Sequence, residues 1–170
     1  MNDLKQQILE GKIFIYPTDT VYGLGCNALD KTSVDKIKHI KGREPNKPLS
    51  IIAPSINWIN KHCIVDFNLK KYLPGEYTII LKKKDEKFLS HVSSGDSIGV
   101  RIPDNDFCDS IRENGIPFIT TSVNLAGEKP ITQISEVPEI VKNNVDILVD
   151  EGKLTGVPST LIIDGEKIKR

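Results

Sequence analysis

Short apolar runs alternate with polar, turn-forming segments along the chain. Each run is four to seven residues long and rich in β-branched or aromatic residues, which suit a buried, pleated surface. The pattern predicts strands over residues 13–16, 49–53, 77–81, 97–103, 117–121, 145–149 and 159–164.

Between these runs, apolar residues recur at helical spacing. The first predicted helix covers residues 3–10 and ends at Gly11. Thr32 or Ser33 is expected to cap a second helix, which carries Lys41 and Arg43 at its end. Further helices are predicted over residues 56–61 after Ser55, from Asp66 to about residue 74, from Asp104 to residue 113, and over residues 135–143.

The interleaved helices and strands predict an α/β fold with a twisted, mixed parallel and antiparallel sheet and flanking helices. Residues 77–103 contain two strand patterns with no helix between them, which favours antiparallel neighbours. The charged run 82–87 between them is expected to be a solvated hairpin or loop. The 170 residues are expected to form one domain, residues 1–170, without disulfides or metals.

Composition narrows the class of protein. Hydrophobic residues make up 38% of the chain and charged residues 27%, which is typical of a globular protein. No apolar run approaches the roughly 20 residues that cross a bilayer, so no membrane contact is predicted. Cys26, Cys63 and Cys108 are odd in number and widely spaced, and no leader pattern precedes them. We therefore expect a reduced, cytoplasmic protein.

Formal charge is balanced over the chain but not along it. Residues 1–85 contain 14 Lys and Arg against 9 Asp and Glu, and residues 86–170 contain 9 against 14. This asymmetry predicts a basic face that would meet a polyanionic partner. The three histidines lack metal-ligand spacing, so no metal site is predicted.

A polar cluster follows each of several predicted strands. These clusters are residues 18–20, Arg101, residues 120–124 and the pair Ser159 and Thr160. Ligands of open α/β folds bind where strand ends and loops converge, so the clusters are expected to line one crevice. Hydroxyls and cations dominate this set, which suits the stabilisation of phosphate or carboxylate groups.

Each of these motifs and residues could also have a purely structural role. Nothing matches G-x-x-x-x-G-K-[ST] or G-x-G-x-x-G, and the Y-G-L-G sequence is more often turn geometry than a ligand contact. Thr20 alone is more often a turn hydroxyl, and Ser122 and Asn124 could equally form a local turn. Lys41 and Arg43 also suit a solvated helix C-terminus.

Five ordered motifs together resemble the YrdC-type threonylcarbamoyl-adenylate synthases, in their short, single-domain form. They are YPTDTVYGLGCNAL, KGREPNKPLSII, IGVRIP, TTSVNLAG and GVPSTLIID, which resemble the family's P-T-E/D-T-x-Y-G-L, K-x-R, V-R-x-P, S-x-N and S-T segments. The resemblance runs over essentially the whole chain.

The resemblance implies a nucleotidyltransferase that uses L-threonine, bicarbonate and ATP. A carbamate formed from threonine and bicarbonate would attack the α-phosphorus of ATP, giving threonylcarbamoyl-AMP and pyrophosphate. The product would pass to the tRNA threonylcarbamoyl transferase machinery, which modifies adenosine next to the anticodon. Mg²⁺ is expected to arrive with ATP, since no carboxylate cage is evident.

The resemblance also implies roles for individual residues. Lys41 and Arg43 would be catalytic, holding the triphosphate and stabilising the charge of the leaving pyrophosphate. Arg101 would hold the threonine carboxylate, because its planar fork can bond both oxygens. The implied ATP site is Lys41, Arg43, Lys47, Ser97, Ser122, Asn124 and Arg170, and the implied threonine site is Thr20, Arg101, Thr120 and Ser159.

The sequence departs from the family pattern in three places. Ile52 stands where some longer members have a histidine that contacts threonine. The AGEKPIT segment after Asn124 does not align cleanly with S-G-x-P, and we expect no counterpart of the C-terminal domain of longer members.

Two alternatives follow from the same residues. The basic face could hold tRNA or double-stranded RNA through phosphate contacts in a module without catalysis. Alternatively, the chain could be a related carbamoyl-adenylating paralogue, as in hydrogenase maturation. ATP turnover and its dependence on threonine separate these possibilities.

Overall fold

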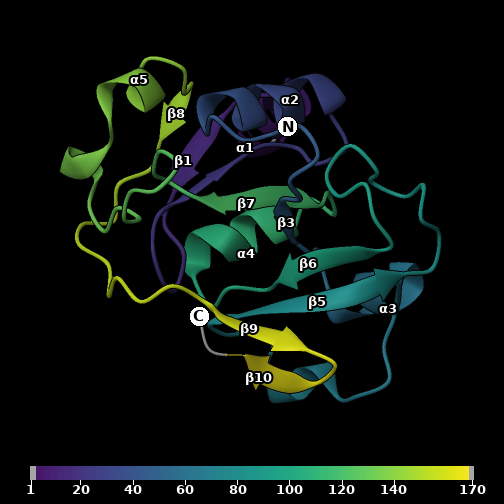
Figure 1. The fold of residues 1–170 in the computed structure, drawn as a ribbon. Coiled ribbons are helices and arrows are strands. Elements are labelled where there is room, and N and C mark those ends of the chain that lie inside the picture. Colours follow the sequence, from purple (N-terminus) through teal and green to yellow (C-terminus); the bar gives the residue numbers. More distant parts are fainter. Residues whose placement is uncertain (1–2, 169–170) are drawn as a thin grey trace.

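The computed structural model describes residues 3–168, whose strands form one mixed sheet (Figure 1). The strands are β1 (Phe14–Tyr16), β2 (Gly23–Gly25), β3 (Ser50–Ile52), β4 (Cys63–Ile64), β5 (Tyr77–Lys83), β6 (Ser97–Arg101), β7 (Phe118–Ser122), β8 (Ile147–Leu148), β9 (Thr160–Ile163) and β10 (Glu166–Ile168). Their order is β10-β9-β5-β6-β3-β7-β2-β1-β8, with β4 paired to β5. The pairs β3 with β6, β5 with β9 and β1 with β8 are parallel, so the predicted mixed sheet is confirmed.

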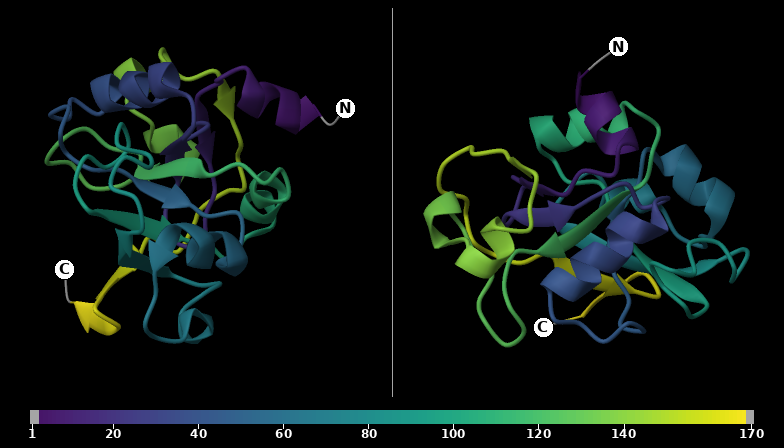
Figure 2. Two further views of the ribbon diagram at one scale, coloured as in Figure 1. Left: turned by 90° about the vertical axis from the view of Figure 1, so that its right-hand side faces the viewer. Right: turned by 90° about the horizontal axis from the view of Figure 1, so that it is seen from above.

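The helices lie on both faces of this sheet (Figures 1 and 2). They are α1 (Asp3–Leu9), α2 (Lys31–Ile40), α3 (Ile56–His62), α4 (Asp106–Arg112) and α5 (Glu139–Lys142), with short 3₁₀ turns η1 (Leu69–Lys71) and η2 (Ile134–Glu136).

Two apolar clusters cover opposite faces of the sheet, since neighbouring strand residues alternate between them. Ile51 and Ile119 belong to the larger cluster, which includes side chains of α2 and α3. Ile52 and Phe118 belong to the smaller one, which includes side chains of α1 and α4. The polar residues Ser50, Arg101 and Thr120 lie on the same face of the sheet as this smaller cluster.

The Y-G-L-G segment is a strand and not the predicted turn. Gly23–Gly25 pairs with β1 on one side and β7 on the other. A Cβ atom on Gly25 would lie 2.0 Å from the carbonyl oxygen of Ile119, and one on Gly23 would lie 2.8 Å from the Tyr16 ring. The glycines are needed for the close approach of neighbouring strands and side chains, and not for a turn.

The charged run 82–87 is not simply a solvated loop. Strand β5 extends to Lys83, whose side chain is buried. Its ammonium donates to the carbonyl oxygens of Glu86, Phe88 and Ser93 at 2.8, 3.0 and 2.8 Å. Burial lowers the pKa of Lys83. The prediction was wrong for Lys83 because charge alone does not show which lysine of a run points inward.

Two helices begin earlier or later than predicted. Asp30, and not Thr32 or Ser33, caps α2, because its carboxylate accepts the backbone N–H groups of both residues. Asn105, and not Asp104, caps α4 in the same way. Asp104 instead donates its backbone N–H to Asp19, a contact of 2.8 Å that matters for the site.

Two predicted helices are much shorter in the structure. The segment expected from Asp66 contains the 3₁₀ turn η1, which Asn68 caps. The segment over residues 135–143 is divided by Pro138 into η2 and α5. Proline lacks the N–H that a continuous helix would need at this position.

Cys26, Cys63 and Cys108 are free thiols buried in the described part of the chain. Burial raises the pKa of Cys63 to about 11. None of the described helices is long and apolar enough to cross a membrane.

Candidate functional site

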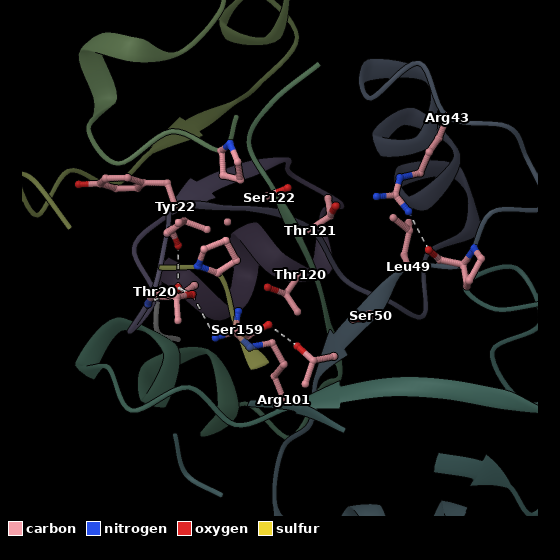
Figure 3. Close-up of a pocket in the computed structure, with 17 residues that line it drawn as sticks. Thr20, Tyr22, Arg43, Leu49, Ser50, Arg101, Thr120, Thr121, Ser122 and Ser159 are labelled. Carbon is pink, nitrogen blue, oxygen red and sulfur yellow. Dashed lines mark hydrogen bonds between the residues drawn. The ribbon is translucent and has the colours of Figure 1, made fainter. Parts of the chain in front are cut away.

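A cavity of about 270 Å³ opens on the face of the sheet formed by β3, β6 and β7 (Figure 3). This volume is just below the roughly 300–1,000 Å³ of typical ligand pockets. Its lining comes from five strands and four loops: Thr18, Thr20, Val21, Tyr22, Gly23, Arg43, Pro48, Leu49, Ser50, Thr78, Arg101, Thr120, Thr121, Ser122, Pro130, Pro158 and Ser159.

Strand register explains why distant polar residues meet here. Ser50 on β3 lies opposite both Gly99 on β6 and Thr120 on β7. Arg101 lies opposite Ile52, two residues further along β3, and so projects from the same face. The predicted crevice is therefore present, although several of its side chains project from the face of the sheet and not from strand ends.

Arg101 is buried at the wall of the cavity and forms an ion pair. Its Nη2 lies 2.8 Å from Oδ1 of Asp19, and the two side chains are 8% and 9% exposed. The same Nη2 donates to the Thr20 hydroxyl at 3.3 Å. The Nε–H is buried and has no hydrogen-bond partner among the described residues. A buried donor of this kind is costly unless a ligand or water satisfies it.

Hydroxyl groups surround Arg101. The Thr20 hydroxyl lies 3.1 Å from that of Thr18, which donates to the Val21 carbonyl at 2.6 Å. The hydroxyls of Thr78 and Ser159 lie 2.6 Å apart, and both residues line the cavity, as does Thr120. The four residues predicted to bind threonine, Thr20, Arg101, Thr120 and Ser159, all line the cavity.

Lys41 lies beside this cavity and is tied to the end of β7. Its Nζ donates to the Ser122 carbonyl and to Oδ1 of Asn124, both at 2.7 Å, and Ser122 Oγ donates to the same Oδ1 at 2.6 Å. Burial, followed by the positive charges of Arg43 and Lys47, lowers the pKa of Lys41 to about 8. Lys41 is only 5% exposed, so the alternative interpretation of this residue as part of a solvated helix C-terminus is wrong.

Arg43 lines the cavity at the side away from Thr20 (Figure 3). Its Nη1 donates to the Pro48 carbonyl at 2.9 Å. Burial lowers its pKa, but a guanidinium stays charged at any physiological pH. Arg43 is thus a fixed cation at one end of a pocket whose other cation, Arg101, is already paired.

Three other predicted ATP ligands, Asn124, Lys47 and Ser97, do not line this cavity. Asn124 contributes only through Lys41 and Ser122, and Lys47 is exposed on the loop after α2. Ser97 lies at the other end of β6 from Arg101, four residues or roughly 13 Å away at the usual strand rise. Arg170 lies outside the described residues.

Several residues near the site had no assigned role in the sequence analysis. Asp19 stood within the 18–20 cluster, but its partners, Arg101 and Asp104, are distant in sequence. Thr78 sits in an apolar strand and gave no signal. Tyr22 reaches away from the cavity, and its hydroxyl donates to the Gly152 carbonyl at 2.6 Å.

This arrangement suits the binding of an anionic, hydrogen-bonding ligand. It offers two guanidinium groups and many hydroxyls, which can hold carboxylate and phosphate oxygens. Among residues 3–168, no group of three or more His, Cys, Asp or Glu side chains could hold a metal ion. Phosphoryl chemistry here would depend on positioning and charge stabilisation.

Comparisons with known proteins identify relatives of this chain. A family model named Sua5_yciO_yrdC, described as "Telomere recombination", matches residues 6–169. A Methanocaldococcus jannaschii protein named "Putative threonylcarbamoyl-AMP synthase" is 44% identical over 97% of this chain and 81% of its own length.

Solved structures show the same fold. Pyrococcus abyssi Sua5 complexed with L-threonine has a TM-score of 0.83 at 30% identity, covering 96% of this chain and 50% of that one. This chain therefore spans half the length of that relative. Escherichia coli YciO has a TM-score of 0.83 at 27% identity, covering 97% of this chain and 84% of that one.

Proposed function

The chain belongs to the Sua5/YciO/YrdC family, and from this premise we propose that it is a threonylcarbamoyl-AMP synthase. It would condense L-threonine and bicarbonate to a carbamate with loss of water, transfer AMP from ATP to that carbamate, and release pyrophosphate. The relative's name and the threonine complex of Sua5 support this assignment.

The observation that carries the proposal is the unsatisfied Nε–H of buried Arg101 at the wall of a hydroxyl-rich cavity. A carboxylate oxygen can accept a charge-assisted hydrogen bond from this N–H, so the carboxylate of threonine would satisfy the donor. Thr20, Thr120 and Ser159 then lie around the bound amino acid, where their hydroxyls can bond its polar groups.

We infer that Arg43, which lines the cavity at the end away from Thr20, contacts the nucleotide phosphates. When the carbamate oxygen attacks the α-phosphorus, the bond to the bridging oxygen breaks and negative charge moves onto pyrophosphate. The positive charges of Arg43 and Lys41 would offset that charge. In the structure two of the Lys41 donors already hold Ser122 and Asn124, so we infer that Lys41 also fixes the shape of the phosphate site.

Other parts of the assignment extend the same proposal. Mg²⁺ would be held by phosphate oxygens and water, since the described residues provide no cage for it. Lys47 and Ser97 remain predicted nucleotide contacts outside the cavity lining. Arg170, which lies outside the described residues, also remains a predicted contact. The downstream tRNA threonylcarbamoyl transferase machinery, a direct tRNA or double-stranded RNA contact, and a cytoplasmic location also remain predictions.

The test is pyrophosphate release from ATP with bicarbonate, comparing L-threonine, L-serine and no amino acid. Release that requires threonine and bicarbonate, and that falls in Arg101→Lys, would support the synthase. Arg112→Lys is the matched control, because Arg112 also pairs with an aspartate but lies outside the cavity.

Two other outcomes would contradict the proposal. ATP binding without threonine-dependent release would favour a related paralogue that adenylates a different carbamate. Binding of tRNA with strong salt dependence and no ATP binding would favour the RNA-binding module.

A further inference from the structure

Asp19 holds Arg101 from a position outside the cavity lining. One carboxylate oxygen, Oδ1, accepts from Nη2 of Arg101 at 2.8 Å. The other, Oδ2, accepts the backbone N–H of Asp104 at 2.8 Å. Because both oxygens are engaged by groups in different segments, the carboxylate cannot rotate without losing a bond.

These contacts also define which part of the guanidinium is left for a ligand. Asp19 and Thr20 both contact Nη2, at 2.8 and 3.3 Å. The buried Nε–H remains without a partner among the described residues. The contacts at Nη2 therefore orient the guanidinium, and the Nε–H stays available for a ligand.

We propose that Asp19 is a positioning residue for the amino acid substrate, which acts by fixing the Arg101 fork for the substrate carboxylate. This inference rests on the proposed function for the identity of the substrate. A preset N–H donor binds a carboxylate more tightly than a mobile one, because less side-chain entropy is lost on binding.

If Asp19 acted only through its charge, its effect on threonine binding would have the opposite sign. Asp19 is an anion paired to Arg101, so its charge alone weakens the attraction between Arg101 and an incoming carboxylate. If orientation dominates, loss of Asp19 weakens threonine binding. If charge compensation dominates, its loss strengthens threonine binding. The sign of the change therefore decides between the two roles.

The first experiment compares Asp19→Asn with the wild type by steady-state pyrophosphate release. The amide can accept one bond through its oxygen, but its NH₂ group cannot accept the Asp104 N–H. We expect the KM for L-threonine to rise about tenfold or more, as for a lost hydrogen bond to a charged group, with less than about a twofold change in the KM for ATP.

Asp109→Asn is the matched control, because Asp109 pairs with Arg112 at 2.7 Å on a more exposed surface. It should leave both KM values unchanged. Asp19→Asn in an Arg101→Lys background should add little to the Arg101→Lys effect, because a residue that acts through another is not additive with it.

A second readout is independent of catalysis. The Arg101 Nε–H resonance, identified by its absence in Arg101→Lys, should shift on titration with L-threonine or with acetate as a simple carboxylate. In Asp19→Asn this shift should require a higher ligand concentration. If the wild type shows no threonine-dependent release, the proposed function fails, and the acetate titration still tests Asp19.

Three results would overturn the inference: a lower threonine KM in Asp19→Asn, an equal change in both KM values, or a full effect in the Arg101→Lys background. Asp19→Glu covers the case in which the asparagine variant does not fold. It keeps the charge but displaces the carboxylate, so its threonine KM should also rise, and an unchanged value would count against orientation.

Discussion

The ammonium of Lys41 lies 2.7 Å from the carbonyl oxygen of Ser122, joining the end of helix α2 to the end of strand β7. A second bond, also of 2.7 Å, runs from the same ammonium to Asn124. No carboxylate takes part in these bonds, so the lysine charge is offset by neutral oxygens alone. Its environment favours the neutral amine and makes its protonation sensitive to mildly alkaline pH.

The pKa of Lys41, lowered to about 8, predicts a pH dependence of nucleotide binding. As pH rises from about 7 to about 9, Lys41 loses its charge and the phosphates lose one compensating cation. The KM for ATP should therefore rise with a midpoint near 8 in the wild type. In Lys41→Arg the profile should be flat over this range, because arginine stays protonated. An unchanged midpoint in that variant would assign the titration to another group.

The same pKa predicts an effect on stability. The folded-state value of about 8 lies below the ordinary 10.5, so between these pH values the unfolded chain holds the proton and the folded chain does not. The contribution of Lys41 to the free energy of unfolding therefore rises with pH in this window. Denaturant titrations of the wild type and Lys41→Met should show the difference between them shift in favour of the wild type from about pH 8 to about pH 10.

Gly25→Ala should destabilise the fold severely. The added Cβ would lie 2.0 Å from the Ile119 carbonyl oxygen, and backbone in the middle of the sheet cannot move away cheaply. We expect a loss of about 3 kcal/mol or more in the free energy of unfolding, measured by denaturant titration. Gly95→Ala is the control, because its Cβ would meet no atom within 4 Å. A similar loss in both variants would mean that backbone freedom, and not the close approach, decides the result.

Lys83→Met should also destabilise the protein. The substitution keeps an apolar chain of similar length but leaves the carbonyls of Glu86, Phe88 and Ser93 without their shared donor. Unsatisfied buried carbonyls cost about 1–3 kcal/mol each before relaxation, so a total loss of roughly 2–4 kcal/mol is expected. Lys82→Met, at the exposed neighbouring position, should change stability by less than about 0.5 kcal/mol. A stable Lys83→Met variant would show that the 84–96 loop does not depend on this ammonium.

Lys83 also shows where sequence-based prediction reached its limit. Strands β1, β3 and β7 were predicted because their apolar side chains are contiguous, and this is the signal of a buried strand. Strand β2 was missed because two of its three residues are glycine, whose place in a sheet depends on neighbours and not on its own propensity.

The site residues also divide into those that the sequence identified and those that it did not. Arg101 and Ser159 were identified from motifs, and both line the cavity. Thr78 could not be found from sequence, because its bond to Ser159 depends on the parallel pairing of β5 with β9 across 81 positions. Asp19 lay within a recognised motif, but its role depends on partners 82 and 85 positions away.

Tyr22 provides a final prediction, about the loop that carries Ser159. Its hydroxyl donates to the Gly152 carbonyl at 2.6 Å and accepts the Glu151 N–H at 3.0 Å, while the Gly156 N–H donates to the Thr20 carbonyl at 3.2 Å. Residues 150–159 are thus attached to the segment next to β2 at two points. Tyr22→Phe removes one of them without changing the ring.

Hydrogen exchange of the Glu151 amide should become about tenfold faster in Tyr22→Phe, as expected for the loss of one hydrogen bond. The threonine KM should rise more than the ATP KM, because Ser159 ends this loop at the cavity. Tyr72→Phe is the control. The Tyr72 hydroxyl donates to the Gly165 carbonyl at 2.8 Å, and neither Tyr72 nor Gly165 lines the cavity. Faster exchange without a change in the threonine KM would separate loop anchoring from substrate binding.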